Sequence, residues 1–153
     1  MPAARRLVLA ATLNDGRILL VGGLAASTTN AVDYSASVYI YNPSTNEYST
    51  KNNAPIRMSG GRSVVLTDGR VVLFPNTVSD GTTVTTSNKR TWLYTPATDT
   101  FVEADPVPAE VAFGGMVGQL SDGTAVYDLA PGEYRIVCKV PGHSSMNSTL
   151  TVD

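Results

Sequence analysis

LNDGRILLVGG, residues 13–23, and LTDGRVVLFPN, residues 66–76, are two versions of one pattern separated by 53 residues. In both, an Asp-Gly pair lies between two apolar runs, which is a strong signal for a tight β-hairpin because both residues tolerate a positive φ. A third version, LSDGT at 120–124, follows at a spacing of 54 residues. We therefore expect each copy to form a strand, a two-residue turn and a second strand.

A second feature has the same period. VYIYNPSTNEY at 38–48 matches TWLYTPATDTF at 91–101, which aligns Tyr41 with Tyr94. Asn-Pro or Thr-Pro followed by polar residues favours a turn, because proline fixes φ at the corner. One unit thus contains four strands, expected at 8–13, 17–23, 37–41 and 47–51 in the first copy and at 64–66, 70–74, 91–94 and 100–104 in the second.

Four strands per unit of 40 to 50 residues are typical of a β-propeller blade, so the sequence predicts an all-β fold. The double glycine Gly22-Gly23 after the second strand, with Tyr41 and Tyr48 seven positions apart, resembles the kelch repeat family. The resemblance covers about residues 5–127, although Pro75-Asn76 replaces the glycines in the second copy. It implies kelch-like blades at 1–55 and 56–110 and a third blade-like sheet at 111–153.

The resemblance also implies a function. Kelch-type propellers present loops on a rigid scaffold, so we expect a non-enzymatic scaffold that binds a protein or small-molecule ligand through its long loops at 24–36 and 75–89. Three copies do not close a ring of the usual 4 to 8 blades. The chain is then a segment of a longer protein, or it associates with other blades or with itself, or another structure covers its ends.

Other repeated residues have structural interpretations. We expect the aromatic residues of the repeat to fill space between strands and blades; they are Tyr41, Tyr48, Trp92, Tyr94 and Phe101. The aspartates Asp15, Asp68 and Asp122 recur at the blade period, which indicates turn formation and not an acid/base pair. A galactose-oxidase-like propeller enzyme is a further alternative, but its metal site needs more than the one histidine of this chain.

PGEYRIVCKVPGHSSM at 131–146 contains the only cysteine and the only histidine of the chain. Together with the following TLTV, it resembles the metal loop and last two strands of cupredoxins over about residues 124–153. The resemblance implies that Cys138, His143 and Met146 are copper ligands in electron transfer. A thiolate, two imidazoles and a weak axial thioether form such a blue-copper site. We expect the last hairpin to join the third repeat hairpin in one four-stranded sheet.

Two departures from the cupredoxin pattern leave alternatives open. Two residues separate His143 from Met146, where the azurin-type loop has three, and the chain has no second histidine. In one interpretation these residues serve only as strands and a turn. In another, they bind a soft ion such as copper with an outside ligand or water. In the last, the full protein or a partner chain supplies the missing imidazole.

Composition limits the partners and the compartment. The formal charge is −2 and no basic stripe is present, which argues against nucleic acid. No run approaches the ~20 apolar residues of a membrane span. The apolar run at 7–13 ends in NDGR instead of a cleavage site, so we do not interpret it as a secretory signal. One cysteine leaves the compartment open; a copper protein of this type would be periplasmic or extracellular.

Overall fold

The computed structural model describes residues 4–25, 33–86 and 88–107, together with the backbone of four further strands. All regular secondary structure in this part of the chain is β-strand, and every strand pair is antiparallel. The all-β fold expected from the sequence is therefore confirmed. The described residues include no helix with the length and apolar character needed to cross a membrane.

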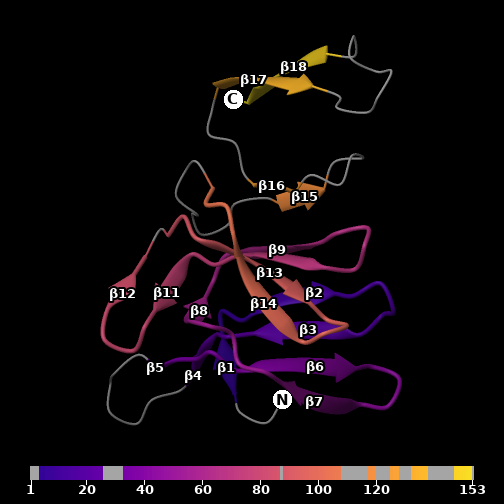
Figure 1. Ribbon diagram of the computed structural model, residues 1–153, viewed down its shortest axis with the longest axis vertical. Helices are drawn as coiled ribbons and strands as arrows, with labels where there is room; N and C mark the ends of the chain where they lie inside the picture. The colour runs from indigo at the N-terminus through magenta and orange to yellow at the C-terminus, as the bar shows by residue number, and fades with distance from the viewer. Residues whose placement is uncertain are drawn as a thin grey trace.

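Two four-stranded sheets form the centre of the molecule (Figure 1). Blade 1 contains, in spatial order, β2 (Leu9–Thr12), β3 (Ile18–Val21), β6 (Val38–Asn42) and β7 (Glu47–Lys51). Blade 2 contains β9 (Arg62–Val65), β10 (Val71–Phe74), β13 (Thr91–Thr95) and β14 (Thr100–Ala104) in the same order. The four strands of blade 1 begin at 9, 18, 38 and 47, and those of blade 2 begin 53 residues later at 62, 71, 91 and 100.

The Asp-Gly turns differ from the predicted two-residue type. Leu13 N–H donates to Arg17 O at 2.7 Å, and Gly16 N–H donates to Leu13 O at 2.9 Å, which closes a three-residue loop. Only Gly16 in this loop has a positive φ, at 85°. This is a type I turn followed by a glycine bulge, which suits the strand twist as well as the expected turn does. The turn at Leu66–Arg70 has the same bonds.

The aspartates of these turns act as the sequence indicates. The Asp15 carboxylate accepts hydrogen bonds from Arg17 N–H at 3.0 Å and from Arg17 Nε at 2.8 Å. Asp68 accepts the same two bonds from Arg70, at 3.0 and 2.7 Å. Both carboxylates therefore hold their turns. Asp122 lies outside the described residues.

The outer hairpin of each blade is held by an aromatic pair. Tyr41 and Tyr48 are directly opposite each other, with ring centroids 4.7 Å apart. The Tyr41 hydroxyl donates to Asn46 Oδ1 at 2.9 Å, and Asn46 takes the left-handed conformation that ends the turn. The same contacts recur in blade 2 between Tyr94, Phe101 and Asp99.

Two small sheets, absent from the sequence prediction, lie on one side of the blades (Figure 1). One contains β1 (Arg5–Arg6), β4 (Leu24–Ala25) and β5 (Asp33–Tyr34); the other contains β8 (Arg57–Ser59), β11 (Thr77–Ser79) and β12 (Val84–Thr85). Parts of the segments expected to be loops at 24–36 and 75–89 are therefore strands. Strands of two or three mostly polar residues are too short to show an alternating apolar pattern.

The main core lies between the two blades. Leu19, Val21 and Ile40 of blade 1 and Trp92 and Tyr94 of blade 2 are all at most 2% exposed. The innermost strands β2 and β9 are neighbours, and a hydrogen bond of 2.6 Å joins Ser63 Oγ to Ala10 O across them. The expected packing role holds for Trp92 and Tyr94. Tyr48 is instead 40% exposed, because β7 is the outer edge strand of blade 1.

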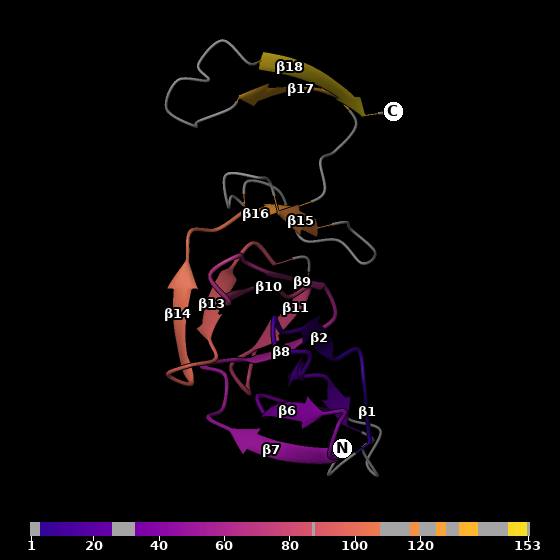
Figure 2. The ribbon, with the colours of Figure 1, turned by 90° about the vertical axis from the view of Figure 1, so that its right-hand side faces the viewer.

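Four strands follow blade 2. β15 (Val117–Gln119) pairs with β16 (Ala125–Tyr127), and β17 (Gly132–Val137) pairs with β18 (Asn147–Val152). Figure 2 shows the second hairpin apart from the first. Among the described strands these are two separate sheets, so the single four-stranded sheet expected here is not present. Among the described strands β16 pairs with β15 and β17 pairs with β18, and no backbone ladder joins the two hairpins.

β15 nevertheless occupies the position expected for the innermost strand of a third repeat. It lies next to β9, as β9 lies next to β2. The innermost strands of three successive repeats are thus neighbours, which is the arrangement of strands around a propeller axis. The sheets do not close into a ring within the described residues. The domain boundaries 1–55, 56–110 and 111–153 stay predictions.

Candidate functional site

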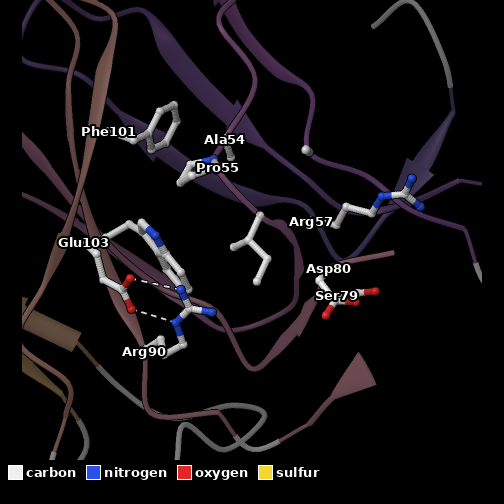
Figure 3. Close-up of a pocket in the computed structure, with 11 residues that line it drawn as sticks. Ala54, Pro55, Arg57, Ser79, Asp80, Arg90, Phe101 and Glu103 are labelled. Atoms are coloured by element: carbon white, nitrogen blue, oxygen red, sulfur yellow. Dashed lines mark hydrogen bonds and ion pairs between the residues drawn. The ribbon is translucent and has the colours of Figure 1, made fainter. Parts of the chain in front are cut away.

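A cleft of about 440 Å³ opens where the two blades and their small sheets meet (Figure 3). Its floor is apolar and comes from the connection between the blades, at Ala54, Pro55 and Ile56, and from Trp92 and Phe101 of blade 2. Both repeats and the segment that joins them are therefore needed to form it. Such junctions are common positions for binding sites.

One wall of the cleft is an ion pair stacked on an aromatic ring. Arg90 donates to the Glu103 carboxylate twice, from Nε at 2.6 Å and from a terminal nitrogen at 3.0 Å. The Arg90 guanidinium carbon lies 4.9 Å from the centroid of the Trp92 ring, which is itself 1% exposed. The hydrogen bond from Arg90 holds the pKa of the Glu103 carboxyl below its ordinary value. Glu103 is therefore an anion at neutral pH.

The opposite wall comes from the small sheets. Arg57 of β8 forms a long ion pair of 3.7 Å with Asp33 of β5, so the contact joins the small sheets of the two blades. Asp80 accepts hydrogen bonds from the backbone N–H groups of Thr83 and Thr82, at 2.7 and 2.8 Å. These two bonds lower the pKa of Asp80, so it too is charged at neutral pH. Figure 3 shows Arg57 and Asp80 across the cleft from Arg90 and Glu103.

The polar side chains that line the cleft include charged groups of both signs. Its described lining residues include two arginines and two carboxylates but no histidine and no cysteine. Ser79 Oγ accepts a hydrogen bond from Gly81 N–H at 3.1 Å, within its own turn. A carboxylate with a lowered pKa is a poor general base at neutral pH. The cleft therefore offers an apolar floor between two charged walls.

A second open cavity of about 490 Å³ lies beside the outer hairpin of blade 1. Its lining includes Arg17, Ile40, Asn42, Glu47 and Tyr48. Because the Arg17 guanidinium is held by Asp15, and the polar groups are those of exposed turns, we regard this cavity as the weaker candidate.

The metal ligands expected from the sequence, Cys138, His143 and Met146, lie outside the described residues. β17 ends one residue before Cys138 and β18 begins one residue after Met146, and the strand ends Val137 and Asn147 are paired. Elsewhere, in the part of the chain that the structure describes, no group of three or more His, Cys, Asp or Glu side chains is arranged to hold a metal ion.

Sequence reasoning located the cleft only in part. The expected binding segments contribute Ala36, Ser79 and Asp80. Arg57 and Arg90 were not singled out, since nothing in their local sequence distinguishes them from other exposed arginines. The 53-residue period aligns Trp92 with Tyr39 but does not indicate that Trp92 is buried while Tyr39 is partly exposed.

Two solved structures are similar in fold. YjhT superimposes with a TM-score of 0.59 and 18% identity, over 74% of this chain and 40% of that chain. A fungal alcohol oxidase of the AA5 family, in complex with copper, superimposes with a TM-score of 0.59 and 15% identity, over 94% of this chain and 29% of that chain. The fold is of the β-propeller type. At these identities the likeness shows the fold alone.

The β-propeller-type chain spans less than half the length of either similar structure. No protein-family model and no curated protein sequence matches it. The copper in the oxidase structure belongs to that protein. Its presence gives no ligand residue for this chain.

Proposed function

We propose that this chain is a non-enzymatic, kelch-type binding scaffold and a segment of a longer protein. The cleft between the blades is the observation that carries the proposal. It has an apolar floor, to which Pro55, Ile56 and Phe101 contribute accessible surface, and fixed charges of both signs on its walls. It binds a segment of a partner protein whose side chains are apolar at the centre and charged on both sides.

The cleft is preorganised for this role. The two hydrogen bonds to Glu103 and the stacking on Trp92 fix the position of Arg90, so little side-chain entropy is lost when a ligand binds. The backbone bonds to Asp80 fix the other wall. A rigid wall favours selection among ligands by charge position.

A displayed peptide library panned against the immobilised chain tests this function. Peptides enriched on the wild-type chain are expected to lose most of their binding to the Ile56→Asp variant, which places a charge on the apolar floor. They are also expected to bind the Arg57→Ala variant several-fold more weakly. Arg6→Ala changes another exposed arginine, in β1 and not in the lining of the cleft, and is expected to bind as the wild type does.

The result that contradicts the scaffold function is enrichment of no peptide, or of peptides that bind Ile56→Asp and wild type equally. Circular dichroism and the fluorescence of Trp92, the only tryptophan, check that each variant is folded.

Copper binding in electron transfer is the second candidate. It is favoured by the cupredoxin-like sequence of the loop and by the paired strands β17 and β18, which bracket that loop on both sides. Cys138 would supply a thiolate, His143 an imidazole and Met146 a thioether. The donor set does not complete a blue-copper site, because such a site needs two imidazoles and this chain has one histidine.

A copper titration separates the candidates. The visible spectrum of the purified chain is recorded as Cu(II) is added, and copper is then measured after buffer exchange. Copper binding predicts an intense thiolate-to-copper band that is lost in Cys138→Ser and weakened in His143→Gln. A colourless protein without stoichiometric copper contradicts this candidate and leaves the scaffold function unaffected.

A further inference from the structure

Equivalent aromatic rings of the two blades each carry a guanidinium group. In blade 2, the Arg90 guanidinium carbon lies 4.9 Å from the centroid of the Trp92 ring, and the Glu103 carboxylate accepts two hydrogen bonds from this guanidinium. In blade 1, the residue 53 positions before Trp92 is Tyr39. The Arg5 guanidinium carbon lies 5.6 Å from the centroid of the Tyr39 ring. The two repeats therefore place a cation over the same ring position, although the two arginines come from different segments of the repeat.

The carboxylate that pairs with the cation in blade 2 has no counterpart in blade 1. Glu103 is directly opposite Trp92 on the neighbouring strand, and Thr50 is directly opposite Tyr39 in the same way. Thr50 is uncharged and exposed. The ion pairs among the described residues do not include Arg5. In this part of the chain, Arg5 is thus a cation over an aromatic ring without a carboxylate partner.

The hydrogen bonds of the Arg5 guanidinium are also incomplete. Its two terminal nitrogens donate one bond each, to Gly22 O and to Ser37 Oγ, both at 3.3 Å. Arg5 Nε is buried and has no hydrogen-bond partner among the described residues. A guanidinium has five N–H donors, so each terminal nitrogen keeps one for a ligand. Because Arg5 is only partly exposed and its charge is unpaired, a bound anion would offset the free energy of removing that charge from water.

An apolar surface lies beside this cation. Strand pairing places four residues on one face of blade 1, because Ile18 is opposite Tyr41 and Leu20 is opposite Tyr39. All four are partly exposed. A free carboxylate bound at Arg5 would leave this apolar surface in water. A protein segment with apolar residues beside an acidic one would cover the surface as well, which is favourable.

We propose that Arg5 and Tyr39 form a carboxylate-binding site, which takes a glutamate side chain of a partner protein together with the apolar residues beside that glutamate. Blade 2 provides the argument for this ligand, since a glutamate of an extended strand binds the equivalent guanidinium there. The ligand carboxylate accepts hydrogen bonds from the terminal nitrogens of Arg5, and its neighbours contact Leu20 and Tyr39. Neither Arg5 nor Tyr39 lines the ligand cleft, so the site does not depend on the proposed function.

Two displayed peptide libraries, panned against the immobilised 153-residue chain, test the site. One library has a fixed glutamate between randomised apolar residues, and the other has glutamine in its place. Glutamate peptides are expected to be enriched at least about tenfold over glutamine peptides, because a hydrogen bond between charged groups is stronger than one with a neutral acceptor. The enriched peptides are expected to bind Thr50→Glu at least about tenfold more weakly, since the new carboxylate, placed as Glu103 is in blade 2, pairs with Arg5. Thr50→Gln is the uncharged control and is expected to bind as the wild type does.

Further variants separate this site from its surroundings. Arg5→Gln removes the cation and is expected to weaken binding as much as Thr50→Glu does. Arg6→Ala changes the neighbouring arginine, and Ile56→Asp changes the ligand cleft, so both are expected to bind the glutamate peptides as the wild type does. Circular dichroism checks the fold of each variant.

Three results overturn the proposal. One is equal enrichment of the two libraries, or enrichment of neither. Another is a set of glutamate peptides that bind folded Thr50→Glu as tightly as the wild type; this variant decides the test if Arg5→Gln does not fold. The last is displacement of the peptides by free acetate at the same concentration, which would show a site for small carboxylates and not for a protein segment.

Discussion

Gly22 of blade 1 lies against the carbonyl oxygen of Met58 in blade 2, so closely that a β-carbon at Gly22 would overlap that oxygen. The next residue, Gly23, donates its N–H to the same oxygen. The double glycine of the first repeat is thus one of the places where the backbones of the two repeats are in direct contact. Its conformational freedom matters too, since both residues have positive φ values, 68° and 92°.

Gly22→Ala is expected to lower the free energy of unfolding by about 2–4 kcal/mol, because the added methyl group forces the blades apart and the φ is unfavourable for alanine. Gly16→Ala is the matched control. Gly16 has a φ of 85°, but no atom lies near a β-carbon added there, so Gly16→Ala is expected to lower the free energy of unfolding by only about 1 kcal/mol. Urea unfolding followed by Trp92 fluorescence measures both. Equal losses would show that the contact with Met58 contributes nothing.

Leucines at the same position of the two repeats are expected to contribute unequally to the free energy of unfolding when each is replaced by alanine. Leu73 is completely buried between the blades, so Leu73→Ala should cost about 2–5 kcal/mol. Leu20, 53 residues earlier, is partly exposed, so Leu20→Ala should lower the free energy of unfolding by less than half as much. Thermal unfolding at low protein concentration compares the two. A similar loss for both would contradict the difference in burial between Leu73 and Leu20.

Leu7→Gly is expected to stabilise the protein by up to about 1 kcal/mol. Leu7 has a φ of 55°, in the left-handed region that is costly for a side chain with a β-carbon. Its counterpart in the second repeat is Gly60, with a φ of 62°. Leu7 is 43% exposed, so little apolar burial is lost. Leu7→Ala keeps the β-carbon and should give no gain in the same unfolding measurement.

Because of the Arg90–Glu103 ion pair, we expect the stability of the folded protein to depend on pH in the acidic range. The pKa of Glu103 is lowered by the hydrogen bond from Arg90, so the pair's contribution is present above the ordinary pKa of 4.5 and is lost as pH falls through the lower folded value. Both side chains are about half exposed, at 47% and 49%, so the contribution is only about 0.2–1 kcal/mol. Carbon-13 NMR titration should show the carboxyl pKa rising in Arg90→Ala. An unchanged pKa there would contradict the pairing.

Because of Tyr94, we expect the stability of the folded protein to fall at alkaline pH. Burial first, and then the hydrogen bond to Asp99, raise the pKa of the Tyr94 phenol well above its ordinary 10.0. Above about pH 10 the unfolded chain loses this proton while the folded chain keeps it, so stability falls as pH rises. Tyr94→Phe should lose less stability than the wild type between about pH 9 and pH 11, measured by urea unfolding. An equal loss would show that another group titrates.

Much of the fold was predictable from the sequence because the signals for it are local. The Asp-Gly turns, the paired aromatics and the alternating apolar residues fix the strands of both blades to within about two residues. The turn type was missed, because Asp-Gly fits either a two-residue turn or a turn that ends in a glycine bulge. The small sheets were missed, because strands such as Arg5–Arg6 carry no pattern of their own.

The residues that line the candidate cleft could be identified only from the tertiary structure. Ala36, Arg57 and Arg90 come from segments far apart in the sequence, and only the tertiary packing brings them to one cleft. The metal loop is the opposite case. Its resemblance is entirely local, and Cys138, His143 and Met146 remain a prediction.

The sequence by itself determined that the chain folds as repeated four-stranded antiparallel sheets, because hairpins form from neighbouring residues whose turns and alternation are written in each repeat. By sequence, Leu20 and Leu73 are equivalent, because they occupy the same position of the repeat, 53 residues apart. Only the tertiary structure separated them. A sheet buries a face only where another sheet lies against it, and, among the described residues, blade 2 has that neighbour on the face where blade 1 has none.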